Sequence, residues 1–226
     1  MLESRLAPTL HSHDASSRSD EAGYALVALI ALMTLLALFA MAAAPSIMQQ
    51  SQREREKEAI FRGEEVAEAI RLYYLMQVRS GRPEGDPSLP TDIDQLVEGV
   101  TVPGRTKKLQ ILRASAARDP LSSKGEWRLV KPRSPEMTDF VRDLMTFAGN
   151  VKPPSSLQLQ TAERLMIMPV VAVTGLPSST GSRSSGSVSS SSGPFIGVSS
   201  SSEQNAVITY YGIDRHDYWV FTPLFR

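Results

Sequence analysis

The chain holds three histidines, and the last of them, His216, lies between Asp214 and Asp217. Imidazole nitrogens and carboxylate oxygens ligate zinc, and carboxylates also ligate calcium. The spacing therefore admits a small metal site in this segment. The number of acidic oxygens is low, however, and three polar residues in a predicted hairpin turn are expected to be solvated. We predict no metal site and no cofactor, with calcium binding by Asp214 and Asp217 as an open alternative.

The rest of the sequence lacks the patterns of common catalytic and nucleotide-binding sites. There is no cysteine, which excludes disulfides, thiolate metal sites and a cysteine nucleophile. No serine stands in a nucleophile elbow, and the loop of residues 174–181 lacks the lysine of a phosphate-binding loop. The 24 basic and 24 acidic residues balance, and basic and aromatic residues are not interleaved. We therefore predict neither an enzyme nor a nucleic-acid-binding protein.

The most informative element is an apolar run from Ala25 to Ala44, which only Thr34 interrupts in 20 positions. A helix of this length crosses roughly 30 Å of hydrocarbon. A discarded signal peptide usually has only about 7–15 apolar residues. The small residues from Ala42 to Ala44 nevertheless suit a signal peptidase, and the charges on both flanks orient the run only weakly. An exported soluble domain and an uncut single-span anchor both stay open.

The junction before this run carries a resemblance. Gly23 ends a polar leader, Tyr24 follows it, and Pro45 lies 21 residues beyond Tyr24. This arrangement resembles the type IV pilins and the pseudopilins of type II secretion. The resemblance implies that a prepilin peptidase cuts between Gly23 and Tyr24. It also implies that Tyr24 becomes an N-methylated terminus, and that Pro45 kinks a helix that stays with the protein.

The same resemblance implies partners and a location. The partners are other pilin-like subunits, the prepilin peptidase and an assembly platform in the inner membrane. The protein is then a single-pass protein of the bacterial inner membrane with its C-terminal domain in the periplasm. The family usually has a glutamate where this chain has Ala28. With that departure, the chain could be a major or a minor subunit, and it could belong to a secretion or a pilus system. Major pseudopilins bind calcium in a C-terminal loop, so the resemblance also keeps calcium binding by Asp214 and Asp217 open.

Beyond the membrane segment, residues 46–79 are rich in good helix formers and contain no proline. Wound at 3.6 residues per turn, their apolar side chains and one glycine form one stripe, with acidic residues opposite. The stripe consists of Ala59, Gly63, Val66, Ala67, Ile70, Tyr73 and Tyr74. Gly63 costs a helix about 1 kcal/mol relative to alanine, which predicts a close approach of another backbone. The segments FRG (Phe61–Gly63) and AIRLYY (Ala69–Tyr74) resemble segments of the long helix in a pseudopilin-like subfamily.

Residues 80–226 are predicted to form the folded domain. Ser80–Pro90 breaks the long helix; short helices are expected at 91–99, capped by Thr91, and after Ser134. Trp127–Val130 is typical of a strand, and the family resemblance implies a hairpin over 111–130. The pattern of residues 164–175 predicts an edge strand. A flexible serine-rich loop is expected at residues 178–202, with one strand at 195–198. Residues 206–211 and 218–222 are predicted to form a closing hairpin.

These elements predict an α+β protein. Its long N-terminal helix is transmembrane at first, then amphipathic, and packs on a small antiparallel sheet as in the pilins. The predicted parts are a cleaved leader (1–23), a membrane or filament-core helix (24–45), its amphipathic continuation (46–79) and a periplasmic domain (80–226). We expect a pilin-like filament subunit. The alternative is a single-span anchored or exported periplasmic protein that binds or scaffolds a partner without assembling.

Overall fold

The computed structural model describes residues 17–101, 108–155, 157–167 and 193–225. The chain divides into two compact units, Met1–Gln50 and Ser51–Arg226. One helix, α1 (Ser17–Arg79), contributes to both units. The prediction of a mixed helix and sheet protein with an apolar N-terminal helix is confirmed. Most of the predicted leader and residues 178–192 of the predicted serine-rich loop lie outside the described residues.

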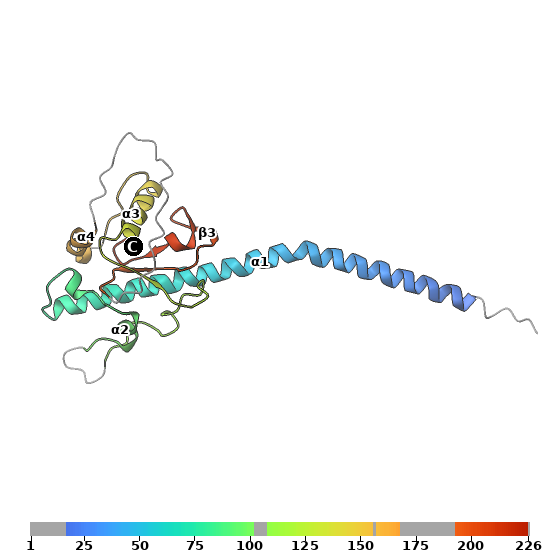
Figure 1. Cartoon of the computed structure of the whole chain (residues 1–226), viewed down its shortest axis with the longest axis horizontal. Helices are drawn as coiled ribbons and strands as arrows, with labels where there is room; N and C mark the ends of the chain where they lie inside the picture. The colour runs from blue at the N-terminus through green and yellow to red at the C-terminus, as the bar shows by residue number, and fades with distance from the viewer. Residues whose placement is uncertain (1–16, 102–107, 156, 168–192, 226) are drawn as a thin grey trace, which may run out of the picture. The chain divides into compact units, whose positions relative to one another are not determined.

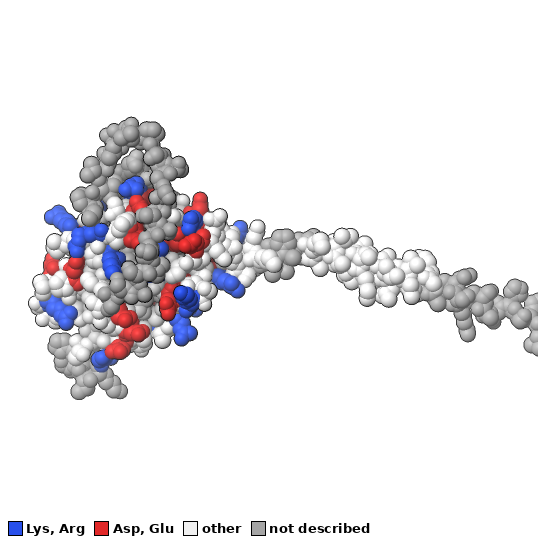
Figure 2. Space-filling model, viewed as in Figure 1, with Lys and Arg blue, Asp and Glu red and all other residues white. Residues whose placement is uncertain are grey.

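The first unit contributes the apolar part of α1. Gly23–Met41 is long and apolar enough to cross a membrane, with a mean hydropathy of 2.5, and none of this window is buried. No Lys, Arg, Asp or Glu interrupts it, as the white surface in Figure 2 shows. The helix continues through Pro45. A kink at Pro45 stays a prediction.

The second half of α1 forms the spine of the Ser51–Arg226 unit (Figure 1). The predicted stripe is confirmed: it is buried, and its side chains join the hydrophobic core, whose α1 members are Val66, Ala67, Ala69, Ile70, Tyr73 and Tyr74. The stripe therefore holds the helix to the domain by apolar burial, the dominant favourable term in folding. Gln77, Val78 and Arg79 end the helix, and Ser80 and Gly81 begin the predicted break.

Two small antiparallel sheets complete the core. The first has the order β1-β2-β5, from β1 (Arg128–Val130), β2 (Gly197–Ser199) and β5 (Val220–Phe221). Leu129 lies opposite Val198, and Val198 lies opposite Phe221. The second sheet is a hairpin of β3 (Asn205–Tyr210) and β4 (Ile213–Arg215). Strands distant in sequence thus close the core over α1.

Both predicted hairpins are wrong in their pairing. Val130 belongs to a strand that pairs with β2, about 70 residues further along the chain, rather than with a neighbour in 111–127. Residues 218–222 do not return along β3. The short strand β4 takes that place through a turn at Tyr211 and Gly212, whose φ angles of 50° and 76° suit a two-residue hairpin. The chain then passes through a 3-10 turn, η3 (His216–Tyr218), into the other sheet.

Helices surround this core. The bounds are α2 (Ile93–Glu98), α3 (Pro135–Phe147) and α4 (Gln160–Met166), with 3-10 turns η1 (Asp86–Ser88) and η2 (Leu157–Leu159). Ser134 caps α3 as predicted, whereas Asp92 rather than Thr91 caps α2. In Figure 1, α2 lies on one side of α1 and α3 on the other. The predicted strand from residue 164 is wrong in its first residues, which end α4; residues 168–175 lie outside the described residues.

Gly63 lies where α1 meets the first sheet. A Cβ atom built on it would lie 2.3 Å from the ring of Phe221. The predicted close approach exists, but its partner is an aromatic ring rather than a backbone. The ring has little room to move, since it also contacts Trp127 and Tyr210, with centroids 5.8 Å and 5.2 Å away.

Candidate functional site

The predicted processing junction lies within α1. Gly23 and Tyr24 are both helical, Tyr24 is 79% exposed, and a Cβ atom at Gly23 would meet nothing within 4 Å. Within the described residues, nothing therefore packs against this junction from outside the helix. Glycine lowers helix stability by about 1 kcal/mol relative to alanine, which eases the local unwinding that a peptidase needs.

The apolar surface after this junction surrounds the helix on all sides. Its large side chains are about half exposed or more, and they are Leu26, Val27, Leu29, Ile30, Leu32, Met33, Leu35, Leu36, Leu38, Phe39 and Met41. A helix that is apolar all round is covered by lipid or by other protein. Ala28, where the pilins carry a glutamate, adds no charge to this surface.

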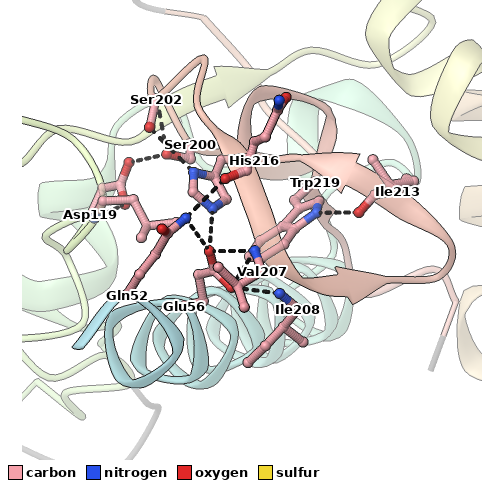
Figure 3. Close-up of polar contacts among 12 residues, drawn as sticks. Gln52, Glu56, Asp119, Ser200, Ser202, Val207, Ile208, Ile213, His216 and Trp219 are labelled. Carbon is pink, nitrogen blue, oxygen red and sulfur yellow. Dashed lines mark hydrogen bonds and ion pairs between the residues drawn. The ribbon is translucent and has the colours of Figure 1, made fainter. Parts of the chain in front are cut away.

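A buried polar cluster joins α1 to the C-terminal part of the chain (Figure 3). Glu56 is 0% exposed, and its carboxylate accepts hydrogen bonds from the backbone N–H groups of Val207 (2.9 and 3.0 Å) and Ile208 (2.7 Å). Its Oε1 atom lies 3.0 Å from His216 Nε2 and 2.9 Å from Gln52 Nε2. One side chain of α1 thus binds strand β3 and the turn η3.

The hydrogen bonds decide the charge state of this carboxyl. Burial alone would raise the pKa of Glu56, but the N–H groups of Val207 and Ile208, together with His216 and Gln52, hold that pKa below its usual value of 4.5. The carboxylate form is therefore favoured. A buried charge is tolerated more readily when it is hydrogen-bonded, as it is here.

Ser202, His216 and Glu56 line up like a serine–histidine–acid relay. Ser202 Oγ lies 3.3 Å from His216 Nδ1, on the other side of the ring from Glu56. Such a relay also needs free N–H groups that stabilise an oxyanion. The N–H of Ser202 donates to Ser200 Oγ, and the N–H of Ser201 donates to Asp119 Oδ2. These two N–H groups are therefore already engaged, and what the described contacts form is a clamp that ties α1 to strand β3 and turn η3.

The predicted polar turn at Asp214–Asp217 is only partly solvated. His216 and Asp217 are buried, whereas Asp214 is exposed. Arg215 holds Asp217 through two hydrogen bonds, of 3.1 Å and 2.9 Å. The expectation of three solvated side chains is wrong because the chain folds back here to place His216 against α1. No group of three or more His, Asp or Glu side chains that could hold a metal ion occurs within the described ranges.

Sequence reasoning missed Glu56, although a signal existed. Glu56 lies three residues before Ala59 and seven before Gly63, so it occupies the same stripe as the buried apolar residues. A carboxylate on such a stripe indicates a buried partner. Surrounded by Arg55 and Lys57 in a run of charges, it reads instead as part of a solvated face.

Comparisons with protein-family models, curated protein sequences and solved structures find no match for this chain.

Proposed function

We propose that this chain is a pilin-like subunit, of a type II secretion or type IV pilus system, that assembles into a filament through its N-terminal helix. One observation carries the proposal: the helix that bears the exposed apolar span of Gly23–Met41 continues into the core of a small α+β domain. The Gly23–Tyr24 junction before the span supports it further.

The working principle is packing. In the inner membrane, lipid covers the apolar span, and the Ser51–Arg226 unit lies in the periplasm. An assembly platform moves the subunit out of the lipid, and the spans of neighbouring subunits then replace lipid as its cover. Burial of each large apolar side chain contributes about 1.5–3 kcal/mol, so helix-to-helix packing supplies ample stabilisation. No bond-making step is needed after the prepilin peptidase has cut at Gly23.

Ala28 favours a minor subunit. In the pilins a glutamate at this place is thought to pair with the amino terminus of a neighbouring subunit, and an unpaired buried charge costs several kcal/mol. The span of this chain has no carboxylate to offer to such a terminus. A subunit at the end of a filament has fewer neighbouring termini, so the absence matters least there.

Cross-linking tests the assembly, because the chain has no cysteine of its own. Leu26 and Leu35 are nine residues apart and therefore face opposite sides of a helix that turns by about 100° per residue. Both are more than half exposed. With Leu26→Cys and Leu35→Cys together, oxidation of native membranes that contain the assembly machinery should give a ladder of multimers. Leu26→Cys alone is the matched control, and it should stop at dimers.

The alternative is an anchored or exported periplasmic protein that binds or scaffolds a partner without assembling. The charges that flank the apolar span specify its orientation only weakly, and this observation favours the alternative. Under this alternative the double-cysteine variant stays monomeric, and that result would overturn the filament proposal.

A further inference from the structure

A pocket of about 490 Å³ lies between the end of α3 and the β3–β4 hairpin. This volume is within the range of small-ligand sites in proteins. The side chains that matter for its chemistry are Asp143, Phe147, Tyr211, Asp214, Arg215 and Tyr218. None of them belongs to the apolar span or to the Glu56 cluster. The pocket thus calls for an explanation of its own.

Aromatic rings form the apolar part of this pocket. Phe147, the last residue of α3, is 63% exposed, although its ring lies 6.0 Å from that of Tyr211. Gly212 allows this approach, since a Cβ atom there would lie 3.2 Å from the Phe147 ring. Tyr211 itself has a φ of 50°, a conformation in which asparagine or glycine is far more usual. The fold therefore bears some backbone strain where it presents the Tyr211 ring.

The charges around the pocket favour a cation. Asp143 and Asp214 both line it; Asp143 is engaged in an interaction of its own, whereas Asp214 is exposed. The negative end of the α3 dipole points in the same direction, and the last turn of α3 carries no basic residue of its own. Among the described residues that line the pocket, Arg215 is the one cation, and its charge is already compensated by Asp217 at 2.9 Å.

Arg215 also shows which cation suits these rings. Its guanidinium carbon lies 4.9 Å from the centroid of the Tyr218 ring, so the pocket already holds one guanidinium over an aromatic face. Arginine is planar, stacks on aromatic rings and binds carboxylates in a fixed geometry, which lysine cannot do. We propose that this pocket binds an arginine side chain presented by a partner protein, with the guanidinium between the Phe147 ring and Asp214. The proposal is independent of filament assembly.

The probes are N-acetyl-arginine amide and N-acetyl-citrulline amide, which have nearly the same shape but differ in charge. The full chain is studied in detergent micelles with 13C-labelled tyrosine rings. Arginine amide should shift the ring signals of Tyr211 and Tyr218 in a saturable manner. The signals of Tyr73 and Tyr74, which are buried in the core, should not move. Citrulline amide should bind far more weakly.

Asp214→Asn should raise the dissociation constant for arginine amide about threefold or more, since it removes a partly exposed ion pair. Phe147→Ala should act in the same direction through the lost ring. Asp94→Asn is the matched control, because Asp94 is an exposed carboxylate on α2 outside the pocket lining, and it should leave the constant unchanged. Equal binding of both amides, equal binding by wild type and Asp214→Asn, or no saturable shift would each overturn the proposal.

Discussion

Glu56 connects the C-terminal part of the chain to helix α1. It offers both carboxylate oxygens to the N–H groups of strand β3 and one of them to His216 and Gln52. Leaving a buried hydrogen-bond donor without its partner lowers the free energy of unfolding by about 1–3 kcal/mol. We therefore expect this single side chain to hold β3 and η3 in place against α1.

Glu56→Gln should destabilise the Ser51–Arg226 unit by about 2 kcal/mol, because an amide cannot accept at both positions. The unfolding midpoint should fall by about 4–8 °C. Fluorescence of the buried Trp127 and Trp219 can report it for the full chain in micelles. The matched control is Glu54→Gln on the same helix, whose exposed ion pair with Lys57 is expected to contribute less than about 1 kcal/mol. Equal midpoints for the two variants would contradict this role.

The stabilisation by Glu56 should also depend on pH. Its folded-state pKa lies below the usual value of 4.5. The contribution is therefore complete above that value and is lost as pH falls through the folded-state pKa. The midpoint difference between wild type and Glu56→Gln should be largest at neutral pH and shrink below pH 4.5. Arg113 likewise lowers the pKa of Glu65, but Glu65 is present in both proteins, so its effect cancels. A difference that stays constant in acid would refute the expectation.

At the scale of elements, the sequence pattern predicted the helices more accurately than it predicted the pairing of the strands. The α1 stripe and the cap of α3 by Ser134 follow from local spacing and local chemistry, so the sequence predicts them. Strand pairing depends on contacts between distant residues. Nothing near Val130 indicates that Gly197 lies opposite it, and nothing in residues 206–222 shows that the last strand changes sheets.

Gly63 gives a test at this scale. In an exposed helix, Gly→Ala stabilises by about 1 kcal/mol. Gly63→Ala should instead destabilise by about 1–3 kcal/mol, because the new methyl group overlaps the ring of Phe221. The unfolding midpoint measures this cost. In a Phe221→Leu background the cost should be smaller, since the ring is gone. A higher midpoint for Gly63→Ala alone would show that the contact is loose.

For the whole molecule, the sequence predicted an apolar N-terminal helix and a mixed helix and sheet protein, but not the clamp inside the Ser51–Arg226 unit. Composition alone identified the apolar run of Ala25 to Ala44, which is long enough to cross a membrane as a helix. The Glu56–His216 cluster could not be predicted with the same ease, since its members are 160 residues apart. The proposed filament role rests on the junction motif, the apolar span and its continuation into the domain core.

Processing at the junction offers a separate prediction. Gly23→Leu should leave the precursor uncut, because the proposed peptidase cuts after a glycine. The substitution should not disturb the chain itself, since a Cβ atom at Gly23 would meet nothing within 4 Å. Immunoblots of whole cells would show the longer chain. Ala25→Leu is the control: it adds the same side chain two residues further on, within the apolar run, and should be cut normally. Normal maturation of Gly23→Leu would remove the processing step from the proposal.

The most direct test of the central claim is the N-terminal residue of the protein recovered from its native membranes, determined by mass spectrometry. The pilin-like role predicts a chain that begins at Tyr24 with an N-methyl group and retains the span up to Met41. A chain that begins near Ala43 would show an exported soluble protein. An intact Met1 would show an uncut anchor, and either result would contradict the filament subunit proposed for this chain.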